Sequence, residues 1–316
     1  MTRGAAVDCG TNSIRLLVAE RDERTGEVTE LARRSRIVRL GEGVGRTGRF
    51  APEALRRTFA ACEEFAEVVG ALRVERLAFV ATSATRDVAD REAFFGGVER
   101  ILGVVPEVIS GDEEARLSFA GATGSLRSGP GPRLVLDIGG GSTELVVGTD
   151  EVGTAVSLDI GSVRLTERHL TGPDGLVDRF TPEGVAAVRR DAEAALDRAA
   201  ARLPSGPPPV LVGVGGSVTT LAAVVRGTRD GLHGLRLGVD DVRAAGERLL
   251  RADRSERAAI EVIEPGRADV VPAGGLILLT AMERLGIPQI VVSTRGLLDG
   301  LVHRLVGRPV PVPYEL

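Results

Sequence analysis

The first forty residues carry apolar runs broken by short polar turns, a pattern typical of β-strands. Strands are expected at about 4–9 and 14–20, and a third one with polar flanks near 27–39. From Pro52 the apolar residues take the three- and four-residue spacing of an amphipathic helix, which predicts a helix over about 52–68. The N-terminal part therefore predicts a sheet with a helix packed on it.

The remainder of the chain alternates between strand and helix patterns. This alternation is typical of the α/β class, with one sheet in each domain. Further strands are expected at Arg76–Val80, Val104–Ile109, Val210–Val214 and Gln289–Ser293. Helices are expected near 87–101, 110–122, 181–203, 218–225, 240–252, 255–263, 274–285 and 295–306.

A glycine- and proline-rich segment, Gly124–Arg133, is the clearest linker in the chain. It predicts a domain of residues 1–125 and a second of residues 126–316, with the last helix a candidate to pack back on the first domain. Two further proline-rich segments interrupt the pattern: Pro204–Pro209 is expected to break a helix, and Arg308–Tyr314 to run extended over a surface or interface.

One sequence motif occurs twice, once near the N-terminus and once just after the linker. Aligned without a gap, the segments that begin at Asp8 and Asp137 share the aspartate, a glycine two residues later and a serine three residues after that. Each predicts a strand–turn–strand hairpin whose turn directs backbone N–H groups and hydroxyls at an anion. An aspartate beside such a turn repels phosphate, which implies a cation or a positioned water. The expected phosphate contacts are Gly10, Thr11, Asn12, Ser13, Gly139, Gly140, Gly141, Ser142 and Thr143.

A third glycine motif, Gly215-Gly216-Ser217, lies between a buried strand and a helix. A helix N-terminus favours an anion, so Gly216 and Ser217 are further candidates for phosphate contact. Tight packing of the strand against the helix explains the same glycines equally well, and both interpretations stay open.

The segment from Ser110 to Arg116 contains three acidic residues in succession. Ser110 and Glu113 have the spacing of a capping box, which explains Glu113 without catalysis. Glu114 favours the helix dipole, or serves as a carboxylate that accepts a proton from an attacking water. Arg86, at the end of a small-residue turn, is either a surface charge or a phosphate ligand. From spacing alone, Arg267 and the Ser293–Gly296 segment are interpreted as structural.

Composition excludes several classes of mechanism. The sequence has no lysine, so all 40 basic residues are arginine, and both a Walker-type phosphate loop and Schiff-base chemistry are excluded. The net charge of −4 argues against a general nucleic-acid binder. Two cysteines in unlike contexts suggest neither a disulfide framework nor a metal cluster, and three scattered histidines support no triad. The sequence has no apolar segment long enough to span a membrane, so no membrane association is expected. The expected location is the cytoplasm.

With these motifs placed, the chain resembles the exopolyphosphatase / guanosine pentaphosphate phosphohydrolase family, which belongs to the superfamily of actin, sugar kinases and heat-shock ATPases. The resemblance runs from Ala5 to about Gly300, and its most specific pieces are Ile109–Leu117 and Leu136–Leu145. It implies two ribonuclease-H-like (actin-like) domains with the active site in the cleft between them. The chain resembles the short, two-domain form of the family, whose members usually form homodimers.

The resemblance also implies roles for individual residues. By the family pattern Glu114 corresponds to the catalytic glutamate, and Arg86 is a further phosphate contact. Asp137 and Glu144 correspond to acidic residues near a divalent cation, usually Mg²⁺, while Asp8 helps to position metal or water.

The expected activity is metal-dependent release of terminal orthophosphate from inorganic polyphosphate. Three alternatives remain open at this stage. One is removal of the 5′-terminal phosphate of guanosine pentaphosphate, another is a kinase of the same superfamily, and the third is a non-enzymatic sensor of an alarmone or nucleotide. The expected partner is accordingly polyphosphate or a phosphorylated guanosine nucleotide.

Overall fold

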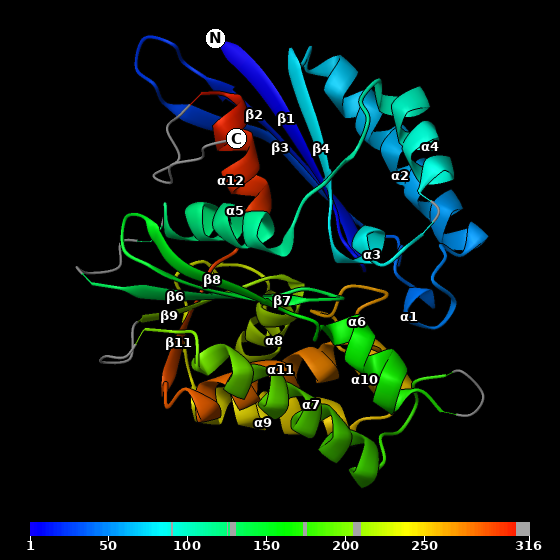
Figure 1. The fold of residues 1–316 in the computed structure, drawn as a ribbon, viewed down its shortest axis with the longest axis vertical. Coiled ribbons are helices and arrows are strands. Elements are labelled where there is room, and N and C mark those ends of the chain that lie inside the picture. Colours follow the sequence, from blue (N-terminus) through cyan, green and yellow to red (C-terminus); the bar gives the residue numbers. More distant parts are fainter. Residues whose placement is uncertain (90, 125, 127–130, 173–175, 205–209, 308–316) are drawn as a thin grey trace. The chain divides into compact units, whose positions relative to one another are not determined.

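A computed structural model describes residues 1–89, 91–124, 126, 131–172, 176–204 and 210–307 (Figure 1). The chain forms two compact units: Met1–Gly121 together with the segment that begins at Gly296, and Ala122–Arg295. The last helix, α12 (Leu297–Leu305), belongs to the first unit, as was considered from the sequence, and the boundary lies between Gly121 and Ala122, four residues before the expected one. Half of the expected linker, the break at 205–209 and the tail from Arg308 lie outside the described residues.

The first unit is built on a five-stranded sheet in the order β3-β2-β1-β4-β5. Its first three strands form an antiparallel meander, and β4 and β5 continue the sheet in parallel. The strand expected at Val104–Ile109 is shorter than predicted because only two residues pair with β4. The strands are β1 (Thr2–Cys9), β2 (Ser13–Arg21), β3 (Val28–Ile37), β4 (Arg76–Ala81) and β5 (Glu107–Val108).

Helices cover both faces of this sheet (Figure 1). One hydrophobic cluster, which includes Phe65, Phe79 and Phe94, joins one face to α2 and α4. A second cluster, which includes Leu117 and Leu301, joins the other face to α5 and α12. The helix expected near 87–101 begins only at Glu92, and a separate single turn precedes it. The helices are α1 (Val44–Thr47), α2 (Pro52–Ala71), α3 (Ser83–Arg86), α4 (Glu92–Leu102), α5 (Gly111–Thr123) and α12.

The second unit repeats the strand order of the first. Its strands β8-β7-β6-β9-β11 follow the arrangement β3-β2-β1-β4-β5, and β10 adds an edge strand. The predicted α/β class with one sheet in each unit is therefore confirmed, although β8 and β10 were not expected. The strands are β6 (Arg133–Ile138), β7 (Thr143–Gly148), β8 (Val152–Leu158), β9 (Val210–Val214), β10 (Arg236–Gly238) and β11 (Gln289–Val292).

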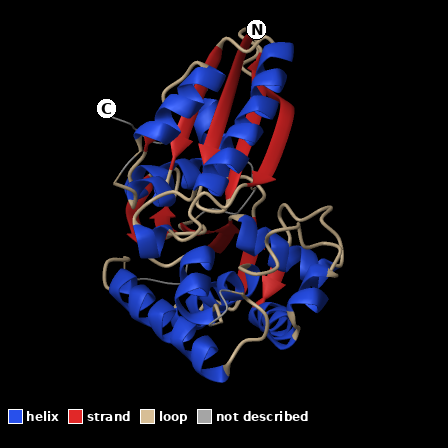
Figure 2. Ribbon diagram, turned by 90° about the vertical axis from the view of Figure 1, so that its right-hand side faces the viewer, coloured by secondary structure: helices blue, strands red, loops and turns tan. Residues whose placement is uncertain are grey.

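One large hydrophobic cluster holds the second unit together. The central helix α11 is buried from Val271 to Met282 and packs against α7, α8 and α9. Figure 2 shows the strands in red and the helices that flank them in blue. A capping box at Asp253 starts α10, and this helix already ends at Ala258, so it is shorter than the helix expected over 255–263. The elements are α6 (Ser162–Leu165), a π-helix η1 (Thr166–Leu170), α7 (Pro182–Ala200), α8 (Gly216–Arg226), α9 (Val239–Arg251), α10 (Arg254–Ala258) and α11 (Val271–Arg284). Among the described residues, no helix is long and apolar enough to cross a membrane.

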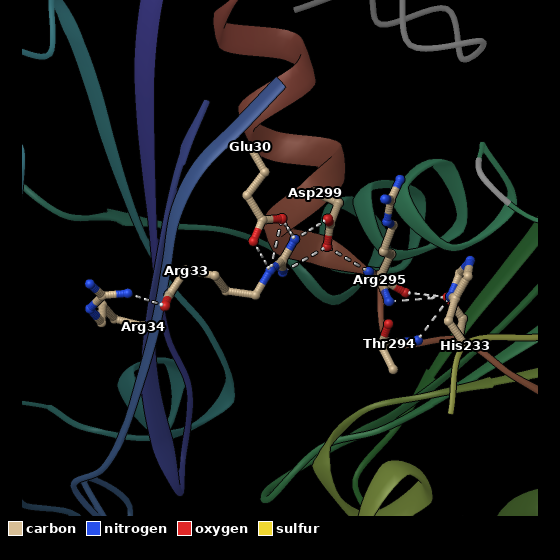
Figure 3. A network of polar contacts seen from close by, with 9 residues as sticks. Glu30, Arg33, Arg34, His233, Thr294, Arg295 and Asp299 are labelled. Carbon is tan, nitrogen blue, oxygen red and sulfur yellow. Dashed lines mark hydrogen bonds and ion pairs between the residues drawn. The ribbon is translucent and has the colours of Figure 1, made fainter. Parts of the chain in front are cut away.

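A partly buried ion pair joins α12 to the sheet of the first unit. The guanidinium of Arg33 on β3 donates to Asp299 on α12 at 2.6 Å and to Glu30 at 2.8 Å (Figure 3). The other carboxylate oxygen of Asp299 accepts the Gly296 N–H at 3.1 Å, which caps α12. Because only 5% of Asp299 is exposed, this pair is held in place by packing as well as by charge.

The helices α5 and α12 also approach each other closely through glycine. A Cβ at Gly300 would overlap the Leu117 carbonyl, whereas a Cβ at Gly96, in the middle of α4, would meet nothing within 4 Å. We expect Gly300→Ala to lower the free energy of unfolding by about 1–3 kcal/mol through overpacking. The matched change Gly96→Ala should raise it by about 0.5–1 kcal/mol, since alanine favours a helix. Urea unfolding followed by circular dichroism measures both, and equal effects would contradict the close contact.

Candidate active site

The first predicted turn lies between β1 and β2. Its ends are fixed by a hydrogen bond from the Gly10 N–H to the Ser13 carbonyl at 2.9 Å. The Thr11 carbonyl accepts from the Gly41 N–H, and the Asn12 carbonyl accepts from the two N–H groups that follow β3. Because the C=O and N–H of a trans peptide point in opposite directions, the N–H groups after these carbonyls are directed away from that loop. The predicted strand–turn–strand hairpin is therefore present, and phosphate binding by its N–H groups stays a prediction.

The side chain of Asn12 is the least satisfied polar group in this turn. Asn12 is 6% exposed, and neither its Nδ2 nor its Oδ1 makes a hydrogen bond within the described residues. Leaving a buried amide without a partner costs about 1–3 kcal/mol. A ligand oxygen or a water bound at the turn would remove that cost.

The predicted catalytic residue and one predicted phosphate contact form an ion pair in the first unit. Arg86 Nη1 donates to Glu114 Oε2 at 2.9 Å and to the Ile109 carbonyl at 3.0 Å. The Glu114 residue is 8% exposed. The segment that leads to Arg86 lies beside the first turn, since the Thr82 N–H donates to the Cys9 carbonyl at 3.2 Å. The fold therefore brings Arg86, Glu114 and the first turn into one neighbourhood.

The neighbouring glutamate has a different role. The Glu113 N–H donates to Ser110 Oγ at 3.2 Å, as one half of the predicted capping box requires. Its carboxylate instead accepts from Arg304 Nη1 at 3.0 Å. The capping box is thus only half correct, because an ion pair with α12 takes the carboxylate.

The second predicted turn, between β6 and β7, repeats the first in detail. The Gly139 N–H donates to the Ser142 carbonyl at 3.0 Å, the counterpart of the bond in the first turn. The start of α6 binds the carbonyls on one side: Ser162 donates to Gly139, and the Val163 and Arg164 N–H groups donate to Gly140. The following N–H groups are consequently directed away from α6.

The predicted metal ligands of the second unit are direct cross-strand partners. Asp137 pairs with Glu144, and Glu144 pairs with Ser157 on β8, so all three share one face of the sheet. Ser157 Oγ donates to Glu144 Oε1 at 2.9 Å, and Glu144 is 1% exposed. In the first unit the corresponding pair is Asp8 with Arg15. The second turn is therefore the more anionic, although the described residues hold no group of three or more His, Cys, Asp or Glu suited to a metal.

The Gly215-Gly216-Ser217 motif connects β9 to α8, and close packing accounts for both glycines. Gly215 has a φ of 92°, and a Cβ there would lie 2.6 Å from the Ile138 carbonyl. A Cβ at Gly216 would overlap the guanidinium of Arg267, which also binds Glu264 Oε2 at 2.8 Å. The structural alternative for this motif is thus supported. Its place beside Asp137 keeps the phosphate-binding alternative open, since Asp137 Oδ1 lies 2.8 Å from the same Gly215 Cβ position.

Three residues that support the site were not found from the sequence. Arg39, with a φ of 50°, donates its N–H to the Asn12 carbonyl at 2.9 Å. Arg164 Nε donates to the Gly141 carbonyl at 2.6 Å, and Ser157 binds Glu144. Each acts on a partner more than ten residues away, so no local pattern marks it.

Both cysteines are buried, and burial raises the pKa of each thiol. The pKa of Cys9 is raised well above its usual value by burial and by the neighbouring Cys62 and Asp8. For Cys62, burial and the nearby Glu63 raise the pKa to about 12. Neither thiol is bonded in a disulfide.

Because the thiolate is the reactive form, we expect both thiols to be inert in the folded protein. Ellman's reagent at pH 8 should detect no fast-reacting thiol in the native state and two after unfolding in guanidinium. One rapidly reacting equivalent in the native protein would show that Cys9 or Cys62 is accessible.

Comparison with known proteins identifies the family. The model of the Ppx/GppA phosphatase family matches residues 17–308. The chain belongs to the Ppx/GppA phosphatase family. It is 42% identical to exopolyphosphatase 2 of Mycobacterium tuberculosis, in an alignment that covers 97% of this chain and 99% of that protein. The family resemblance predicted from the motifs is thus confirmed.

Solved structures support the same assignment. An exopolyphosphatase-like protein is 41% identical with a TM-score of 0.90, covering 97% of this chain and 99% of that one. The Aquifex aeolicus Ppx/GppA family member is 31% identical with a TM-score of 0.78, covering 96% and 98%. Nucleoside triphosphate hydrolases of Neospora caninum share the fold alone, with 11% identity and a TM-score of 0.53, covering 96% and 92%.

Proposed function

We propose that this phosphatase is an exopolyphosphatase, which hydrolyses the terminal phosphoanhydride bond of inorganic polyphosphate and releases orthophosphate. The 42% identity to exopolyphosphatase 2, along nearly the full length of both chains, is the observation that carries this proposal. The two repeated turns support it, since each presents backbone N–H groups suited to phosphoryl oxygens. We further propose that each of these turns is a phosphate-binding site.

Glu114 acts as the general base in this proposal. Its carboxylate accepts a proton from the water that attacks the terminal phosphorus, while the bond to the bridging oxygen breaks. The 2.9 Å ion pair with Arg86 fixes the orientation of the carboxylate. Arg86 also places positive charge where the transferring phosphoryl group carries negative charge. Catalysis of this kind consists mostly of positioning and electrostatic stabilisation.

A divalent cation fits the second unit better than the first. Mg²⁺ binds through one or two carboxylates and completes its shell with water and substrate phosphates. Asp137 and Glu144 supply two carboxylates on one sheet face beside the glycine turn, whereas Asp8 faces an arginine across the strand pair. We propose that Asp137 and Glu144 hold Mg²⁺ and that Asp8 positions a water. Bound there, the ion supplies positive charge to the phosphates.

Glu114→Gln should leave the fold intact and lower turnover by about 10²–10⁴-fold, the usual contribution of a general base. Phosphate release from polyphosphate by the purified variant measures this effect. Near-normal turnover in a folded Glu114→Gln variant would remove the assignment.

The adjacent residue offers a matched control. Glu113→Gln changes the same side chain type one position earlier, but its partner is Arg304 on α12. We expect turnover within about twofold of wild type and a loss of less than about 1 kcal/mol in stability, typical of a partly exposed ion pair.

Activity should require a divalent cation, and Asp137→Asn should raise the Mg²⁺ concentration needed for half-maximal rate. Loss of one negative oxygen ligand weakens the binding of a hard cation. A titration of activity with Mg²⁺ after chelation compares the two proteins. Undiminished turnover in excess chelator would exclude the metal.

Polyphosphate should be hydrolysed with a higher kcat/KM than guanosine pentaphosphate. The sequence offers no evident stacking site for guanine, since it has no tryptophan and a single tyrosine, Tyr314. Capture of a polyanion by arginines should also weaken as salt rises, because screening lengths shorten. Parallel assays at matched Mg²⁺ and ionic strength decide the order. If guanosine pentaphosphate is the better substrate, the sister activity is correct and Glu114 keeps its role.

Two further features stay predictions from the sequence. The first is a homodimer, which light scattering coupled to size-exclusion chromatography would measure. The second is a cytoplasmic location. A sensor without turnover, the non-enzymatic alternative, predicts binding of a guanosine nucleotide with no phosphate release in the assays above.

A further inference from the structure

A groove runs along the edge of the second sheet, within the unit Ala122–Arg295. It has a cavity volume of about 550 Å³, and the consecutive residues Val156–Ile160 line one side of it. Successive side chains of a strand point to opposite faces, so a wall of consecutive residues is the edge of the strand. This edge is that of β8, the last strand in the sheet order. The opposite wall is α7 and the turn after it.

The accessible lining of the groove carries positive charge. Arg198 and Arg202 are exposed, and within the described residues neither guanidinium group makes a hydrogen bond or an ion pair. Arg198 belongs to α7 and Arg202 to the turn after it, and both line the groove. Guanidinium groups bind phosphate in a bidentate manner, and two in a row suit an anion with more than one phosphoryl group.

The acidic residues of the groove offset this charge only in part. Asp191 is already paired, because it accepts from Arg168 Nη1 and is joined to His169 Nε2, both at 2.8 Å. The remaining carboxylate, Asp159, lies exposed on the β8 side. Arg198 and Arg202 therefore retain their charge for a ligand.

Two connections join the groove to the candidate active site. Ser157 lines the groove and donates its hydroxyl to Glu144 at 2.9 Å. On the opposite wall, Arg168 belongs to the π-helix η1, which continues directly from α6. The start of α6 binds the carbonyls of the second turn. A π-helix is rare and frequently marks a functional site.

We propose that this groove is a second anion-binding site, which takes an inorganic oligophosphate through Arg198 and Arg202. The apolar lining residues Val156, Leu158 and Ile160 are at most 7% exposed, so they offer no platform for a nucleoside base. Outside the Arg168–Asp191 pair, the exposed charged groups that line the groove are the Arg198 and Arg202 guanidinium groups and the Asp159 carboxylate. The proposal does not depend on hydrolysis, since neither arginine is assigned to the reaction.

Protection from chemical modification tests the location directly. The full chain is treated with phenylglyoxal, with and without tripolyphosphate, and the modified arginines are identified by mass spectrometry. Tripolyphosphate should slow modification of Arg198 and Arg202 but not of Arg190, an exposed arginine of α7 outside the groove. Equal rates at Arg198 and Arg202 with and without tripolyphosphate would overturn the proposal. This readout requires no turnover, so it is separate from a failure of the proposed function.

Calorimetry with variants tests the affinity. Two proteins are compared: the Glu114→Gln variant, and the same variant that also carries Arg198→Ala and Arg202→Ala. The first should bind tripolyphosphate at one additional site, or should bind it in the groove at least about tenfold more tightly than the second. Arg190→Ala is the matched control and should leave binding unchanged. Identical isotherms for the double variant and its parent would refute the site. GTP should bind the groove more weakly than tripolyphosphate. Tighter binding of GTP would show that the ligand of the groove is a nucleotide and not an inorganic oligophosphate.

Discussion

The hydrogen bonds that hold the turn carbonyls are the interaction on which both glycine-containing turns depend. In the first unit, the loop after β3 binds the carbonyls of Thr11 and Asn12. In the second, the start of α6 binds those of Gly139 and Gly140. Binding the carbonyls from one side directs the following N–H groups to the other, where an anion is favoured. Without these contacts a glycine-rich turn would sample many conformations, and ordering it would fall to the substrate.

The two units use this common scaffold for different chemistry. The first turn has side chains where the second has glycines: Asn12 aligns with Gly141, and its amide is buried without a partner in the described residues. Across the strands, Asp8 faces an arginine, whereas Asp137 faces Glu144. The repeat therefore conserves the backbone and changes the charge. In the function that we propose, the first copy contacts phosphate directly and the second holds the cation.

The sequence predicted the parts of the fold whose signal is local. Both hairpins follow from the glycine and serine residues that lie between apolar runs. The edge strands β8 and β10 were missed because their sequences, which begin at Val152 and Arg236, are of mixed polarity, and β10 has only three residues. Their strand conformation depends on pairing with β7 and β11. The two-residue β5 shows the converse, since the apolar run at 104–109 extends well beyond the residues that pair with β4.

The site itself was predictable only in part, and Glu114 shows why. Its spacing favoured a helix-dipole role, and only the family resemblance indicated catalysis. The structure adds a contact that spacing cannot reveal, because Arg86 reaches Glu114 across 28 positions of the chain. That contact distinguishes it from Glu113, which points to Arg304. Two adjacent glutamates at the start of α5 thus have different partners. The Glu113 carboxylate binds Arg304 of α12. The Glu114 carboxylate lies near the turn between β1 and β2 and binds Arg86, which we propose also binds phosphate.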